Sequence, residues 1–231
     1  MNKAVTSKAK YKTRQAYLDA ALALIHSEGP AKLSMRKVAN HMGVSPMAVY
    51  KHFANKDELM AAALDAFIAR SDVYPADELP WDEWVQHLAR GMYRALAGEV
   101  NWISALGGIR YGEQALRVTD SFKTKLISAG FTPRDTLQAY MAMTQLVVGA
   151  ASIRASVALD GETRVGLMGS YIQQLLNSDS PSDRDMAEEL MLSAQTPLVD
   201  IGIPMLIEAM RLKTGDRPRL TPDDASLATA Q

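Results

Sequence analysis

The sequence contains no cysteine and only four histidines among its 231 residues. The absence of cysteine excludes a disulfide-stabilised scaffold, a thiolate metal site and a cysteine nucleophile. The longest apolar runs, such as 146–151 and 201–207, are shorter than the about 20 residues needed to span a bilayer. The N-terminal segment is polar and basic, without the apolar core of a secretory signal. We therefore expect a soluble protein of the cytoplasm with no membrane partner.

Catalytic signatures are also missing. The sequence has no Gly-x-Ser-x-Gly elbow, no Gly-Lys-Ser/Thr phosphate loop and no Gly-x-Gly-x-x-Gly turn. Glu83 and His87 lie four residues apart and could begin a metal site, but a di-metal helical bundle needs a second Glu-x-x-His and further carboxylates. We interpret this pair as a surface pair and expect no metal, no cofactor and no enzymatic activity. A helical-bundle enzyme stays as the least favoured alternative.

The sequence shows no strand-like alternation and no internal repeat, so it predicts an all-α protein. Two helical domains are expected, 11–71 and 75–214, flanked by a basic flexible tail over 1–10 and a second flexible tail over 215–231. In the second domain the apolar spacing and the glycine and proline positions predict helices over about 81–97, 102–106, 112–129, 133–159, 162–176, 184–194 and 197–213, with a loop at 179–182.

Two short helices joined at Gly43 are predicted in the first domain. Ser34 is a suitable N-cap for a helix over 35–42, in which apolar residues recur at helical spacing. Glycine then ends that helix, because it adopts the left-handed backbone conformation without the steric penalty of a Cβ atom. Ser45 and Pro46 are typical of the cap and the first position of a second helix.

The second helix has one inward and one outward side. Val49 and Phe53 are four residues apart and are predicted to face the core. That orientation leaves an outward set: Met47, Ala48, Lys51 and part of Tyr50. A short rigid helix held in this way is the reading helix of a helix-turn-helix, which lies in the major groove of DNA.

Charge is divided unevenly along the chain. Residues 1–56 contain ten Lys or Arg and two Asp or Glu, a net charge of +8, whereas the remainder contains 15 basic and 24 acidic residues, a net charge of −9. A basic end suits a phosphate backbone, since each neutralised phosphate releases counterions. A solvated charged surface is the alternative, and the neighbouring helix-turn-helix favours DNA.

The flanking sequence extends this pattern. Thr13 can cap a helix that comes before the helix-turn-helix in the sequence. Asn55 and Glu58 form a capping pattern at the start of a fourth helix. Together with Gly43-Val44-Ser45 followed by Tyr50, Phe53, Lys56 and Leu59, this order closely resembles the TetR (tetracycline-repressor-like) family of bacterial regulators over about 11–71. The resemblance implies an N-terminal three-helix helix-turn-helix domain followed by a helical effector-binding and dimerisation domain, in a cytoplasmic, nucleoid-associated protein.

The residues expected to contact DNA combine side-chain chemistry with this resemblance. Chemistry favours the basic side chains near the reading helix, and the resemblance assigns phosphate contacts to Tyr50 and Lys56. The expected set is Arg36, Lys37, Ser45, Pro46, Met47, Ala48, Tyr50, Lys51, His52 and Lys56. The front of the reading helix is apolar, so we expect thymine-methyl contacts and DNA shape to outweigh hydrogen bonds to bases. For His52, capping of its own helix is the alternative.

The resemblance also implies a small-molecule cavity and a dimer interface in the second domain. Candidate cavity residues are Trp84, Tyr93, Trp102, Arg110, Phe122, Met141, Gln145 and Tyr171, although such residues more often form core. Candidate interface residues are Gly149, Ala151, Ser152, Ala155, Ile203, Leu206 and Met210, with burial inside the monomer as the alternative. Two-fold symmetry would place two reading helices about 34 Å apart and predicts a palindromic operator.

These expectations combine into one function. The sequence predicts a homodimeric DNA-binding transcriptional regulator, a repressor released from double-stranded DNA by a small-molecule effector whose identity the sequence does not reveal. A ligand-independent or activating DNA-binding protein of the same fold is the alternative.

Overall fold

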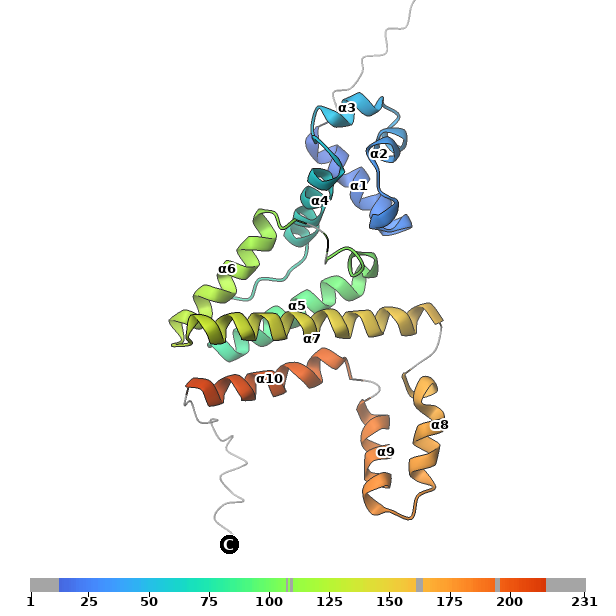
Figure 1. Ribbon diagram of the computed structural model, residues 1–231, viewed down its shortest axis with the longest axis vertical. Helices are drawn as coiled ribbons and strands as arrows, with labels where there is room; N and C mark the ends of the chain where they lie inside the picture. Colours follow the sequence, from blue (N-terminus) through green and yellow to red (C-terminus); the bar gives the residue numbers. More distant parts are fainter. Residues whose placement is uncertain (1–12, 107, 109, 161–163, 194–195, 215–231) are drawn as a thin grey trace, which may run out of the picture. The chain divides into compact units, whose positions relative to one another are not determined.

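The computed structural model describes residues 13–106, 108, 110–160, 164–193 and 196–214. These residues form helices and turns without a strand, which confirms the all-α prediction (Figure 1). The helices are α1 (Arg14–Glu28), α2 (Met35–Met42), α3 (Pro46–Tyr50), α4 (Lys56–Arg70), α5 (Trp81–Gly98), α6 (Glu113–Ser128), α7 (Pro133–Asp160), α8 (Arg164–Leu176), α9 (Pro181–Ser193) and α10 (Leu198–Thr214). Short 3-10 turns occupy Pro30–Lys32 and Val100–Trp102.

One helix and one loop predicted in the second domain differ from the structure. The helix expected over 102–106 is a 3-10 turn at Val100–Trp102 followed by hydrogen-bonded turns. The loop expected over 179–182 ends earlier, because Pro181 begins α9. Proline has no N–H to leave unpaired and its fixed φ suits the first helical turn, so it starts this helix. The tails predicted over 1–10 and 215–231 lie outside the described residues.

The described chain divides into two compact units. The first contains 1–70 together with 104–116, and the second contains 71–103 together with 117–231. The sequence-based division assigned 104–116 to the second domain, whereas in the structure this segment clusters with the first unit. The helix α6 is therefore continuous through both units, with its first turn in one and its remainder in the other.

In the first unit, a small core holds the helix-turn-helix in place. The apolar side chains that fill it come from all four helices and from the segments between them: Tyr17, Leu18, Ala21, Ile25, Leu33, Met35, Val38, Ala39, Val49, Phe53, Leu59, Ala63 and Leu64. Val38, Val49 and Leu59 are fully buried, from three different helices. Burial of each such side chain contributes roughly 1.5–3 kcal/mol, and so α3 is held firmly although it has only five residues.

In the second unit, α5, α7 and α10 pack against one another around Trp84, Leu88, Met143, Val147 and Ile203. Ion pairs reinforce this packing at the ends of α10: Arg211 with Asp82 at 2.6 Å, Arg90 with Asp200 at 2.6 Å and Lys213 with Asp135 at 3.1 Å. Helices α8 and α9 pack against each other as a hairpin around Ile172, Leu175 and Ala187 (Figure 1).

None of the described helices has, by itself, the length and hydropathy of a membrane span. Helices α9 and α10 reach that threshold only when taken together, and they are bent by 111° at their break.

Candidate nucleic-acid interface

The turn between α2 and α3 is fixed by a glycine in the left-handed region. Gly43 has φ +64° and ψ +39°. Its N–H donates to the carbonyl of Asn40 at 3.1 Å, and the N–H of Val44 donates to that of Ala39 at 3.0 Å. This pair of bonds is a Schellman motif, which satisfies the last carbonyls of α2. The predicted glycine stop is confirmed, and it sets where α3 begins.

Helix caps complete the local framework. Ser34 Oγ accepts the N–H of Lys37 at 3.2 Å, and Thr13 Oγ1 accepts that of Ala16 at 3.3 Å. Pro46 occupies the first position of α3 as predicted, but the Ser45 side chain makes no capping hydrogen bond. An unbonded hydroxyl at the start of α3 leaves Ser45 free to serve as a hydrogen-bond donor.

The start of α4 is held by a variant of the expected capping pattern. Asn55 Oδ1 accepts the N–H of Glu58 at 2.9 Å, as a capping box requires. The Glu58 carboxylate accepts a hydrogen bond from the N–H of Ala54 at 2.7 Å, one residue before the cap residue Asn55. These bonds fix the loop that joins α3 to α4, and with it the position of Lys56.

The orientation of α3 matches the prediction. Val49 and Phe53 are 0% and 1% exposed, whereas Met47 and Tyr50 are 68% and 47% exposed. Met47 is largely exposed to solvent on the open side of α3, and its apolar side chain can contact thymine methyl groups. The helix therefore turns one flank into the core and leaves the other open.

Three basic side chains are exposed at α3 and on the elements next to it in the sequence. Arg36, Lys51 and Lys56 are exposed on α2, at the end of α3 and at the start of α4. The Lys56 ammonium donates to the carbonyl of Ala31 at 3.3 Å, in the 3-10 turn between α1 and α2. Exposed cations on α2, after α3 and on α4 suit contacts with the phosphates on either side of a groove.

Two of the expected DNA-contacting residues have partners inside the first unit. Lys37 forms an ion pair with Glu28, and this hydrogen bond lowers the pKa of the Glu28 carboxyl. The His52 ring packs against the Tyr17 ring in a tilted arrangement, with 4.9 Å between ring centroids, and is half-buried. Both residues consequently brace α2 and α3 against α1.

In the sequence, Arg14 contributes only to the positive charge of residues 1–56, but the structure places it beside Phe53 at the end of the reading helix. Its guanidinium lies 4.6 Å from the centroid of the Phe53 ring, immediately after α3. Cation–π contacts of this kind hold a guanidinium over an aromatic face while leaving its edge able to bind phosphate. A basic residue at the start of a helix that packs behind the helix-turn-helix was the only signal for it.

The residues expected to line an effector cavity are not brought together. Trp84, Tyr93 and Trp102 are buried in the core of the second unit, whereas Met141, Gln145 and Tyr171 are exposed. Arg110 lines a groove of about 330 Å³ in the first unit, together with Lys56, Asp57 and Met60. Phe122 lines a different cavity, between α6 and α7. Aromatic and methionine residues at helical spacing indicate burial, and this signal does not distinguish a core from a cavity wall.

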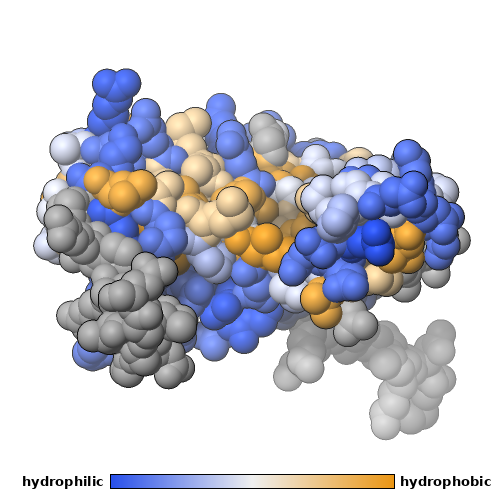
Figure 2. All heavy atoms as spheres, turned by 90° about the horizontal axis from the view of Figure 1, so that it is seen from below, coloured by the Kyte–Doolittle hydropathy of each residue, from blue (hydrophilic) through white to orange (hydrophobic). Residues whose placement is uncertain are grey.

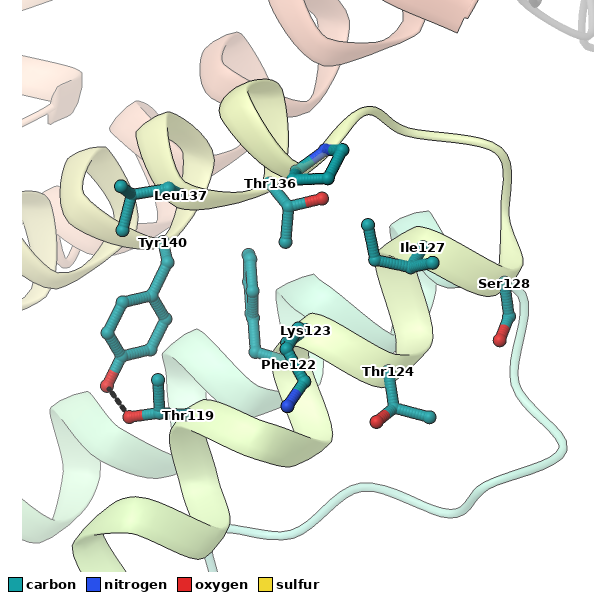
Figure 3. A pocket seen from close by; sticks show the side chains of 10 residues that line it. Thr119, Phe122, Lys123, Thr124, Ile127, Ser128, Thr136, Leu137 and Tyr140 are labelled. Carbon is teal, nitrogen blue, oxygen red and sulfur yellow. Dashed lines mark hydrogen bonds between the residues drawn. The ribbon is translucent and has the colours of Figure 1, made fainter.

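The cavity at Phe122 has a volume of about 570 Å³ and opens to solvent (Figure 3). Its walls are formed by the C-terminal half of α6 and the first turns of α7: Thr119, Phe122, Lys123, Thr124, Ile127, Ser128, Pro133, Thr136, Leu137 and Tyr140. At one edge Thr119 Oγ1 donates to the Tyr140 hydroxyl at 2.9 Å, which ties the two helices together.

No group of three or more His, Asp or Glu side chains suited to a metal ion occurs within the described ranges. Glu83 and His87 are both exposed on α5. This exposure fits their interpretation as a surface pair.

Comparison with known proteins identifies the helix-turn-helix. The sequence pattern of the family described as bacterial regulatory proteins, tetR family, matches residues 18–63, which cover α1 to most of α4. The tetracycline repressor protein class C of Escherichia coli is 29% identical over 153 residues, which are 65% of this chain and 70% of that protein. The helix-turn-helix is of the TetR family. An HTH-type transcriptional regulator of Saccharopolyspora erythraea is a further relative, also 29% identical, over 61% of this chain and 60% of its own length.

Solved structures of TetR proteins share the fold of about nine tenths of the chain. The Streptomyces coelicolor regulator SCO7222 aligns with a TM-score of 0.71 and 21% identity, covering 90% of this chain and all of that one. Apo ActR from the same organism aligns with a TM-score of 0.70 and 18% identity, over 89% and 97% of the two chains. A TetR variant from Acinetobacter baumannii in complex with minocycline aligns with a TM-score of 0.63 and 22% identity, over 87% and 98%.

Proposed function

We propose that this chain is a sequence-specific DNA-binding transcriptional regulator that represses by binding a palindromic operator as a homodimer and is released by a small molecule. The observation that carries the proposal is the position of α3, whose Val49 and Phe53 are buried while its opposite flank stands open between exposed basic side chains. A helix held in this way is the reading helix of a helix-turn-helix.

The contacts divide by chemistry. We assign phosphate contacts to Tyr50, Lys56 and Arg14, whose hydroxyl or cationic ends lie on elements that flank α3. The front of α3 and the nearby basic side chains read the groove, through Ser45, Pro46, Met47, Ala48, Lys51 and Arg36. Lys37 and His52 act mainly as braces within the domain, because Glu28 and Tyr17 already engage them.

Repression and release by a small molecule are supported by the relatives. The tetracycline repressors that match this chain are named as repressors, and structures of the same fold contain minocycline, (S)-DNPA or actinorhodin. A regulator of this kind acts in the bacterial cytoplasm, on DNA of the nucleoid.

Homodimerisation is supported by an exposed apolar surface on α7 and α10. Leu146, Gly149 and Ile153 lie on one side of α7 at helical spacing, and a Cβ atom at Gly149 would meet no atom within 4 Å. On α10, Ile201 is 37% and Met205 is 70% exposed. Figure 2, which views the molecule from below, shows hydrophobic side chains gathered in the middle of this side between hydrophilic flanks.

The two parts of this surface adjoin. A Cβ atom at Gly202 on α10 would lie 3.0 Å from Leu146 Cδ2 on α7, so the two helices approach closely at this point. The predicted interface residues Ala151, Ile203 and Met210 are buried inside the chain, while Gly149, Ser152, Ala155 and Leu206 are half-buried. We therefore place the dimer contact on Leu146, Gly149, Ile153, Ile201 and Met205, which remain accessible on this surface.

Selection of duplexes from random DNA with the purified full chain tests this function. The expected result is enrichment of an inverted repeat whose half-sites are one helical turn apart, centre to centre. Binding of the selected duplex, measured by fluorescence anisotropy, should weaken on Lys51→Ala. It should remain unchanged on Arg94→Ala, which removes an equal charge from an exposed position on α5. Failure to enrich any sequence, or equal effects of both variants, would contradict the proposal.

A further inference from the structure

The wall of the cavity between α6 and α7 includes a buried threonine whose hydroxyl has no hydrogen-bond partner within the described part of the chain. Thr136 is 4% exposed, and its Oγ1 finds no hydrogen-bond partner among the residues that the structure describes. Figure 3 shows the Thr136 side chain projecting from α7 toward α6, into the space bounded by Phe122, Ile127 and Tyr140. A buried polar group without a partner costs roughly 1–3 kcal/mol, so a native protein seldom retains one without a use.

We propose that this cavity is a binding site for a compact, mostly apolar, uncharged molecule, which hydrogen-bonds to Thr136 and is the small-molecule effector. The volume of about 570 Å³ lies within the range of small-molecule sites. The inference rests on the proposed function for the role of the molecule, whereas binding to the cavity does not depend on DNA.

The walls define the chemistry of the molecule. The Phe122 and Tyr140 rings, 5.3 Å apart between centroids in an edge-to-face arrangement, present aromatic surfaces beside the aliphatic side chains of Ile127 and Leu137. The cationic Lys123 lies among the lining residues, but it is already paired with Asp120 on the same helix at 2.5 Å. An apolar interior with a neutralised charge favours an uncharged aromatic molecule over an anion.

The hydroxyl gives the site one polar contact. The Oγ1 atom is closed off from solvent in this conformation, and a rotation about χ1 of Thr136 would turn it toward the cavity. It would then accept or donate one hydrogen bond, and the entering molecule would supply the partner that the fold does not. One polar contact in an apolar pocket fixes the orientation of the molecule.

Occupancy of the cavity acts on a helix that also reaches the first unit. The lining residues Thr119 to Ser128 belong to the later part of α6, while Glu113 to Leu116 at its start cluster with the first unit. The cavity wall and the first turn of α6 therefore belong to one continuous helix. The wall of the cavity is thus connected to the first unit through the backbone of α6.

The test uses N-phenyl-1-naphthylamine, an uncharged aromatic fluorophore with one N–H group, titrated into the full chain without DNA. The probe should bind the wild type with enhanced fluorescence. Ile127→Trp, which fills the cavity from a side chain that is 42% exposed, should lower its affinity by about tenfold or more. Met141→Trp is the matched control, because Met141 is 54% exposed on α7 and does not line the cavity.

Thr136→Val separates a ligand contact from a structural role. Valine keeps the shape of the side chain and removes the unpaired hydroxyl, so the melting temperature should stay unchanged or rise. The affinity for the probe should fall by about three- to tenfold, the worth of one hydrogen bond. A lower melting temperature would show that the hydroxyl serves the fold and would overturn its assignment to a ligand.

Two further outcomes would overturn the assignment of this cavity as a binding site. One is absence of probe binding to the wild type, and the other is equal binding by wild type and Ile127→Trp, which would place the probe on another surface. Binding of the selected operator duplex is measured separately on the same proteins. A protein that binds its operator but not the probe contradicts the cavity alone, whereas one that binds the probe but no duplex contradicts the proposed function.

Discussion

Asp65 caps the first turn of α6 from another helix: its Oδ1 accepts the backbone N–H of Gln114 at 3.2 Å and that of Ala115 at 3.4 Å. The first N–H groups of any helix lack intrahelical partners, and a carboxylate is a strong acceptor for them. The residue before α6 is Gly112, where a Cβ atom would lie 2.2 Å from Asp65 Oδ2. Only glycine leaves room for this cap.

The cap predicts a coupled pair of effects. Asp65→Ala should lower the free energy of unfolding by about 1–2 kcal/mol, because two N–H groups lose their acceptor. Gly112→Ala should cost a similar amount in the wild type by forcing the carboxylate away, and much less in an Asp65→Ala background. Urea denaturation of the four proteins in this cycle measures the coupling. Additive losses would show that Gly112 and Asp65 do not interact.

For Lys56, we expect a loss of DNA affinity that is independent of sequence. Lys56→Ala should weaken binding to the selected operator and to a scrambled duplex alike, and should reduce the slope of log affinity against log salt by about one, since one phosphate contact is lost. Anisotropy titrations between about 50 and 200 mM salt give this slope. An unchanged slope would remove Lys56 from the phosphate contacts.

For Lys51, the expected loss is confined to one position of the operator. Lys51→Ala should change discrimination there by about 1–3 kcal/mol, because a side chain at the end of the reading helix reaches base edges. Competition with single-substitution duplexes locates the position. A uniform loss across all duplexes would show that Lys51 only positions the protein.

The turn at Gly43 predicts a backbone effect without a packing effect. A Cβ atom added there would meet no atom within 4 Å, so the cost comes from the left-handed φ alone. Gly43→Ala should destabilise the protein by about 1–2 kcal/mol and Gly43→Asn by less, since asparagine tolerates this conformation. Thermal unfolding compares them with Gly98→Ala, a change in an exposed helical position with open space at Cβ, which should cause no loss.

The ion pair between Arg211 and Asp82 predicts that the stability of the fold depends on pH in the acidic range. Burial raises the pKa of the Asp82 carboxyl, but hydrogen bonds from Arg211 and the N–H of Glu83 outweigh that effect and hold the pKa below its usual range. A lowered pKa in the folded state means that the stabilisation is present above the unfolded pKa of about 4 and is lost as pH falls through the folded value.

We therefore expect Asp82→Asn to cost about 1–2 kcal/mol near neutral pH and progressively less below about pH 4. Denaturation curves at several pH values measure this difference. Asp120→Asn is the control, because its pair with Lys123 is exposed on α6 and should contribute little. A cost that stays constant down to about pH 2 would contradict the role of the ion pair.

Most of the first unit could be predicted because its signals are local. A cap, a stop and a start depend on residues within one turn of each other, so Ser34, Gly43 and Pro46 determine their elements wherever the chain folds. The inward direction of Val49 and Phe53 follows from their spacing alone. The capping contact of Asp65 on α6 could not be predicted, because it joins residues about 50 positions apart.

The sequence by itself determined the all-helical class, the helix-turn-helix with its open flank, and the concentration of positive charge beside it, since each depends on short-range spacing or composition. Only the tertiary structure decided that Trp84, Tyr93 and Trp102 are core while Phe122 lines a cavity, and that Lys37 and His52 are engaged within the domain. The physical reason is that helical periodicity states which side of a helix is apolar, whereas the neighbours that cover that side are chosen by long-range packing.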